Sequence, residues 1–183
     1  GLSTPALAGM RTGLVSDPPS PIETDRDRAC IHRRDAAGLA GLRHSCANLV
    51  AMAVQELFPG AQLTIGPVID NGFYYDFAYE RSFTPEDLQA IEKRMKEIIK
   101  RKPSFTRSEM KRDEAIAMFK KMGEDYKIEL IEGIPDEEVS IYHTGDEWLD
   151  LCKGTHIESA KEIRSFKLLS VAGAYWRGDE RKA

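Results

Sequence analysis

The stretch QLTIGPVIDNGFYYDFAY at residues 62–79 decides the fold class of this chain. Two runs rich in β-branched and aromatic residues, 62–69 and 73–79, flank Asp70-Asn71-Gly72. Asn-Gly between two such runs is a strong hairpin signal, because both residues tolerate the positive φ that a tight turn requires. We therefore predict two antiparallel strands, and a hairpin of this kind can form the floor of a pocket.

Two amphipathic helices are predicted, one on each side of the hairpin. The first runs from Arg43 to Phe58 and ends at Pro59-Gly60. Its apolar stripe consists of Cys46, Leu49, Val50, Ala53 and Leu57. The second begins at Thr84, has Pro85 in its first position, and runs to about Arg101.

The rest of the chain mixes further strands and one short helix. After Pro103 we expect a strand of seven residues, then a helix over 112–121 that Gly123 closes. Residues 124–132 fit a strand or a helix equally well. The remaining predicted strands cover 138–143, 146–151 and 163–176. Because helices and hairpins mix without a regular βαβ alternation, the pattern predicts an α+β fold, an antiparallel sheet with packed helices.

The chain divides into a leader and one folded domain. Residues 1–38 carry prolines and scattered charge but no sustained apolar period, so burial cannot offset the entropy of ordering them. We expect a disordered leader, or a remnant of processing or cloning, followed by one folded domain over 39–183.

Composition narrows the class of protein. Of 183 residues, 42% are hydrophobic and 31% charged, which is ordinary for a globular domain. No apolar run is long enough to cross a bilayer, and the first residues do not follow the order of a secretory signal. The odd number of cysteines, Cys30, Cys46 and Cys152, argues for free thiols. We expect a cytoplasmic protein with no membrane partner.

Charge is distributed unevenly along the chain, whose net charge is -4. Basic residues dominate from Lys93 to Lys121, whereas from Glu124 to Asp150 the acids face only Lys127. A basic run is either a solvated helix face or a phosphate-binding patch, and both readings stay open. The candidates for nucleic-acid contact are Lys100, Arg101, Lys102, Lys111 and Arg112.

Two polar pairs carry the chemistry: His44 and Asn48 in HSCAN, and Cys152 and His156 in CKGTH. Spacing by four places both members of a pair on one face of a helix or tight turn. Imidazole and thiol groups can hold a metal, position a water or bind a polar substrate. Asn48 stands where a second His would complete a four-ligand set, which disfavours tetrahedral zinc.

Five motifs together resemble a known family. They are RHSCAN at 43–48, IGPVIDNGFYYDF at 65–77, YK at 126–127, DLCKGTH at 150–156 and AGAYWRGD at 172–179. In this order they resemble the editing domain of bacterial-type threonyl-tRNA synthetase, the second amino-terminal domain of that enzyme. The family is related to the editing domain of alanyl-tRNA synthetase.

The resemblance implies proofreading. Serine lacks only one methyl group of threonine, a difference worth about 1–3 kcal/mol, so a synthetic site attaches it too often. A second pocket that admits serine and excludes threonine then hydrolyses the seryl ester with water. The implied partners are the 3′ end of tRNA(Thr) carrying serine and a threonyl-tRNA synthetase catalytic domain; no DNA partner is implied.

Residue roles follow from the same resemblance. His44 and His156 would position or deprotonate the attacking water. Lys127 would orient that water or stabilise the oxyanion, unless it only forms a salt bridge with Glu124, Asp125 or Glu129. Asp150 would hold the α-amino group, and Cys152 would line the pocket.

Further expectations concern the pocket wall and the altered motif position. Tyr74 and Tyr75 would stack against adenine or wall the pocket. Asn48 would hold a water or a substrate hydroxyl, but it cannot take up a proton. If the family's second His is the proton acceptor, activity falls on the order of a hundredfold or more. If that His only shapes the pocket, editing survives with altered selectivity.

Two alternatives to this enzyme remain. One is a hydrolytically inactive module that binds tRNA or docks a synthetase. The other is a metal-dependent hydrolase of free aminoacyl esters or of another aminoacyl-tRNA. We expect no cofactor, and zinc at His44, Cys152 and His156 is disfavoured.

Overall fold

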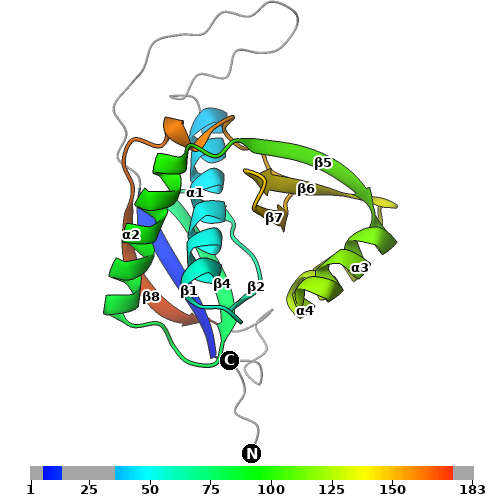
Figure 1. Ribbon diagram of the computed structural model, residues 1–183, viewed down its shortest axis with the longest axis horizontal. Coiled ribbons are helices and arrows are strands. Elements are labelled where there is room, and N and C mark those ends of the chain that lie inside the picture. The colour runs from blue at the N-terminus through cyan, green and yellow to red at the C-terminus, as the bar shows by residue number, and fades with distance from the viewer. Residues whose placement is uncertain (1–5, 14–35, 175–183) are drawn as a thin grey trace, which may run out of the picture.

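The computed structural model describes residues 6–13 and 36–174. Figure 1 shows two antiparallel sheets, of which the larger lies behind two long helices and the smaller carries two short helices at its far end. The predicted α+β class is confirmed. None of the helices in the described ranges is both long and apolar enough to cross a membrane.

The larger sheet is built around the predicted hairpin. Its strands are β1 (Ala6–Gly13), β2 (Gln62–Leu63), β3 (Val68–Ile69), β4 (Gly72–Tyr79) and β8 (Lys167–Ala174). Their order is β2-β4-β1-β8, and β3 also pairs with β4. Val68 lies opposite Phe73 and Ile69 opposite Gly72, so the turn falls at Asp70-Asn71 as predicted.

The disordered leader was a wrong prediction for part of its length. Residues 6–13 form β1, which pairs antiparallel with β4 on one side and β8 on the other. Residues 36–38 belong to the first helix. A strand of this kind owes its order to partners far along the chain, which a local apolar period does not reveal. The rest of the leader, 1–5 and 14–35, lies outside the described residues, as does 175–183.

The long helices α1 (Ala36–Leu57) and α2 (Pro85–Arg101) pack on the larger sheet. Residues 45–54 of α1 are buried on every side, in the centre of the main core. The helix begins seven residues before the predicted start, through a glycine-containing turn that carries no apolar stripe. The predicted second helix is confirmed, and Thr84 and Asp87 form its capping box.

The smaller sheet has the order β5 (Phe105–Lys111), β6 (Glu138–Thr144), β7 (Trp148–Leu151). The short helices are α3 (Arg112–Met122), which ends at Gly123 with φ 74°, and α4 (Asp125–Glu132). The ambiguous segment 124–132 is thus mainly helix. The predicted strand over 163–176 is shorter, because a 3-10 turn (Ala160–Glu162) leads into β8, which begins only at Lys167.

Candidate functional site

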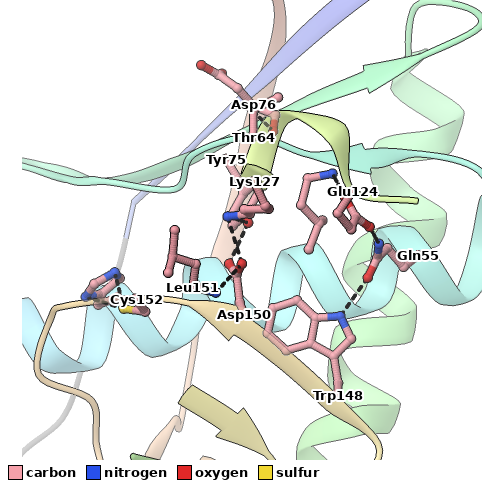
Figure 2. Close-up of polar contacts among 12 residues, drawn as sticks. Gln55, Thr64, Tyr75, Asp76, Glu124, Lys127, Trp148, Asp150, Leu151 and Cys152 are labelled. Atoms are coloured by element: carbon pink, nitrogen blue, oxygen red, sulfur yellow. Dashed lines mark hydrogen bonds and ion pairs between the residues drawn. The ribbon is translucent and has the colours of Figure 1, made fainter. Parts of the chain in front are cut away.

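The candidate site lies where β7 faces α1. Strand alternation puts Trp148, Asp150 and Cys152 on one buried face. On α1, His44 and Gln55 lie three turns apart. The three residues of the buried face run alongside this part of the helix as one row, with Cys152 near His44 and Trp148 near Gln55. Figure 2 shows this row, with Asp150 between the two ends.

His44, Cys152 and His156 meet at one end of the row. The Cys152 sulfur lies 3.2 Å from Nε2 of His44 and 3.0 Å from Nε2 of His156. One ligand atom of each residue lies within 4.8 Å of the others. The turn at Gly154 crosses directly over the His44 ring, and a Cβ at this position would collide with that ring. His44 of the first predicted pair therefore converges with both members of the second, Cys152 and His156.

Aromatic rings surround the imidazole of His156. The His44 ring stacks on it with centroids 4.5 Å apart, and the Tyr142 ring lies 4.2 Å away. Phe105 stacks at 5.5 Å. Sequence reasoning missed Tyr142 and Phe105, because aromatic residues in strands give no local sign of which ring they will contact.

The cluster is uncharged at neutral pH. Burial, followed by the nearby His44, lowers the pKa of His156 to about 3. Burial also lowers the pKa of His44, against a smaller opposing effect of Asp150. Burial raises the pKa of the Cys152 thiol to about 12. Two neutral imidazoles can accept a proton, whereas a protonated thiol is a poor nucleophile.

A buried ion pair occupies the middle of the row. Nζ of Lys127 lies 2.7 Å from Oδ1 of Asp150, and the side chains are 3% and 4% exposed. The Tyr75 hydroxyl donates to Oδ2 of Asp150 at 2.6 Å and accepts from Lys127 at 3.1 Å. The backbone N–H of Leu151 also donates to Asp150. Lys127 thus forms an ion pair with Asp150, whereas the alternative partners that the sequence suggests are acids close to it in the chain, Glu124, Asp125 and Glu129.

The two adjacent tyrosines have different positions. Tyr75 is 1% exposed, and its ring stacks on Phe77 with centroids 4.8 Å apart. The ring of Tyr75 therefore packs in the core, while its hydroxyl group contacts Asp150 and Lys127. Tyr74 is half-buried and points to the opposite face of β4, since successive strand residues alternate. Only Tyr75 joins the candidate site.

A buried carboxyl group closes the other end of the row. Gln55 and the backbone N–H of Leu63 donate to Glu124, and Trp148 donates through Nε1 to Gln55 at 2.7 Å. Burial raises the pKa of Glu124. Figure 2 shows the bonds from Glu124 through Gln55 to Trp148, which join the start of α4 to α1 and β7. The Leu63 bond adds β2 to this group. Sequence reasoning considered Glu124 only as a partner of Lys127.

The basic candidates do not form one patch. Lys100, Arg101 and Lys102 lie at the end of α2, whereas Lys111 is the last residue of β5 and Arg112 the first of α3. Seven strand residues separate these groups by roughly 20 Å. Arg101 pairs with Glu56, and Arg112 donates to the Ile134 carbonyl. Lys100, Lys102 and Lys111 are exposed.

Asn48 lies one helical turn after His44 and is 2% exposed. Its Nδ2 has no hydrogen-bond partner in the described part of the chain. Three imidazole and thiol donors would suffice for zinc with one open position, but an amide is a poor fourth ligand. The Cys152 sulfur lies within hydrogen-bond distance of both imidazoles. Among the described residues the cluster therefore offers three imidazole and thiol donors, and we derive no step through a metal.

Comparison with known proteins agrees with the resemblance. Residues 139–183 match the family model described as "Threonyl and Alanyl tRNA synthetase second additional domain". This match covers the C-terminal part of the chain, and the chain is similar to an editing-type domain of the threonyl-tRNA synthetase kind.

The most similar relatives include threonine--tRNA ligases of bacteria. The chain is 57% identical over 99% of its length to the enzyme of Janthinobacterium sp. (strain Marseille). It is 56% identical over 99% to that of Nitrosomonas europaea and 55% over 99% to that of Rhodospirillum rubrum. It spans about 28% of the length of each of these ligases.

Proposed function

We propose that this domain hydrolyses the ester of serine on the 3′ end of tRNA(Thr), as the proofreading part of a threonyl-tRNA synthetase. The observation that carries the proposal is the convergence of His44 with Cys152 and His156, beside the buried pair of Lys127 and Asp150. The similarity to threonine--tRNA ligases supports the same assignment.

The neutral imidazoles supply the general base. In the proposed reaction a water oxygen attacks the ester carbonyl carbon while His44 or His156 takes the water's proton. The carbonyl π electrons move to the carbonyl oxygen, which becomes an oxyanion. When it collapses, the bond to the ribose oxygen breaks and the imidazolium returns its proton to that oxygen. Serine and a free tRNA hydroxyl result.

Asp150 and Lys127 are assigned to substrate charge. Asp150 would receive the α-ammonium group of the seryl ester, because Tyr75, Leu151 and Lys127 already hold its carboxylate in place. Lys127 would share its charge with the oxyanion as the ammonium group engages Asp150. Cys152 would present its thiol to the seryl hydroxyl and leave no room for threonine's methyl group.

Contacts to the rest of the tRNA are assigned to exposed lysines. Lys100 and Lys102 at the end of α2, and Lys111 on β5, would bind phosphate, while Arg101 and Arg112 would contribute less because they already have internal partners. The catalytic domain of a synthetase would present the tRNA.

One assay tests this function. Seryl-tRNA(Thr) and threonyl-tRNA(Thr), each labelled in the amino acid, are incubated with the protein, and loss of each ester is followed. The proposal expects the seryl ester to decay much faster than without protein and the threonyl ester to persist. Decay of both at the uncatalysed rate would contradict it.

A second candidate is an inactive module that binds tRNA or a synthetase. The observation in its favour is Asn48, a buried amide with no partner in the described part of the chain and no capacity to take up a proton. The Asn48→His variant separates the two. If only the variant hydrolyses the seryl ester while both proteins bind tRNA(Thr), the module is the better account.

A further inference from the structure

The hydroxyl group of Ser45 makes three contacts at the back of the His156 ring. Ser45 is fully buried on α1. Its Oγ lies 2.9 Å from the Gly41 carbonyl oxygen, 3.1 Å from the Ile157 backbone nitrogen and 3.0 Å from Nδ1 of His156. The Gly41 carbonyl oxygen can only accept a hydrogen from Ser45, and the Ile157 backbone N–H can only donate one to it.

Counting hydrogens fixes the third contact. A serine hydroxyl has one hydrogen to donate. If this hydrogen pointed to His156, Oγ would face the Gly41 carbonyl at 2.9 Å with no hydrogen between two oxygen atoms, which is repulsive. If it points to Gly41, both remaining contacts are donors to Oγ. All three bonds are then made, provided that Nδ1 of His156 carries the hydrogen.

We propose that Ser45 is the positioning residue of His156, holding its hydrogen on Nδ1 and directing the lone pair of Nε2 toward Cys152. The other nitrogen of a functional imidazole is commonly fixed in this way by an outer hydrogen-bond partner. Here the partner is a helix side chain one residue after His44, so α1 positions both rings.

The direction of the remaining bonds follows. Nε2 of His156 accepts, so the thiol hydrogen of Cys152 points to it across 3.0 Å. The sulfur has then used its hydrogen, so His44 donates from Nε2 across 3.2 Å. The series of hydrogen bonds therefore runs from His44 through Cys152, His156 and Ser45 to the Gly41 carbonyl. The lone pair on Nδ1 of His44 is the imidazole lone pair that takes no part in this series.

The tautomer can be read directly on the whole chain. Long-range ¹H–¹⁵N correlation spectra at neutral pH distinguish a protonated from an unprotonated ring nitrogen, and loss of signals in His156→Gln assigns the ring. We expect His156 with hydrogen on Nδ1 and none on Nε2. Hydrogen on Nε2 in the unmodified protein would overturn the inference, whatever the behaviour of any variant.

Variants test the consequence for activity, which rests on the proposed deacylase function. Ser45→Ala should mix the two tautomers and lower kcat for seryl-tRNA(Thr) about 10 to 100-fold with KM unchanged. Ser45→Thr keeps the hydroxyl and should keep the tautomer. Cys46→Ala is the matched control, because Cys46 is equally buried one residue further along α1 and is a core residue.

Each remaining result decides one question. Retention of the single tautomer and of kcat in Ser45→Ala would overturn the inference, as would equal losses of kcat in Ser45→Ala and Cys46→Ala. If the unmodified protein leaves seryl-tRNA(Thr) intact, the proposed function fails. The spectra of the unmodified protein and of Ser45→Ala still decide the role of Ser45 in that case.

Discussion

Lys127 and Asp150 form an ion pair 2.7 Å long that is almost completely shielded from water. The pair joins α4 to β7, and Tyr75 brings β4 of the larger sheet to the same point. Three elements that are distant in the sequence therefore depend on one buried charge balance.

Breaking this pair should be costly. Asp150→Asn leaves the Lys127 ammonium group buried without a counter-charge, and we expect a loss of about 3–5 kcal/mol in the free energy of unfolding. Asp146→Asn, an exposed aspartate in the turn before β7, is the control and should change little. Urea unfolding measures both. Equal stability of the two variants would contradict the prediction.

Acid should weaken the fold through His156. Its folded-state pKa, about 3, lies below its ordinary value of 6.5, so the unfolded chain takes up this proton first as the pH falls. Stability due to the neutral ring is complete above pH 6.5 and is lost toward about pH 3. The slope for one group is at most about 1.4 kcal/mol per pH unit. Urea unfolding across this range should give a steeper pH dependence for the unmodified protein than for His156→Gln; parallel curves would refute the prediction.

Removing the Glu124 carboxylate should loosen α4. Glu124→Ala leaves the N–H groups of Gln55 and Leu63 buried without their acceptor, which costs about 1–3 kcal/mol. Glu132→Ala, at the exposed end of the same helix, is the control. Chemical denaturation compares the two. We expect the Glu124 variant alone to lose stability beyond the usual surface range of about 0.5 kcal/mol.

Gly154 should tolerate no side chain. In Gly154→Ala the new methyl group overlaps the His44 ring, so either the ring or the turn must move. We expect a loss of about 1–3 kcal/mol in stability together with reduced seryl ester hydrolysis. Gly173→Ala adds a methyl group with no neighbour within 4 Å and is the control. Similar behaviour of the two variants would show that the close approach of Gly154 to His44 is unimportant.

Zinc should not accompany the purified protein in stoichiometric amounts. Its three donors lack a fourth imidazole or thiol, and the thiol proton must be displaced before a metal binds. Mass spectrometry of metals should find well below one equivalent, and a chelator should leave ester hydrolysis intact. Asn48→His supplies a fourth donor and should raise the zinc content. A full equivalent in the unmodified protein would contradict this expectation.

Local sequence signals predicted most of the elements. Asn-Gly specified the turn before β4, and Thr84 with Asp87 specified the start of α2, because both act within a few residues of chain. Residues 124–132 stayed ambiguous for the opposite reason. Their helix is selected by packing, with Ile131 buried against Phe119 of α3 and Ile141 of β6.

The residues of the candidate site also divide into those that local sequence signals predicted and those that only the fold brings together. Motif spacing was sufficient to nominate His44, Cys152 and His156, and they do converge. Motif spacing gave no sign of Ser45 or Tyr142. Ser45 lies 111 residues before His156 in the sequence. Tyr142 lies on β6, whereas His156 follows β7. Motif spacing also gave Tyr74 and Tyr75 equal weight, although only Tyr75 faces the site.

Residue types and their spacing along the chain thus decided the kinds of element, the α+β class and the identity of the reactive groups, since each depends on neighbours in sequence. Packing decided the pairing of Lys127 with Asp150, the place of β1 between β4 and β8, and the neutral state of the imidazoles. These depend on burial and on partners that only the folded chain brings within a few ångströms.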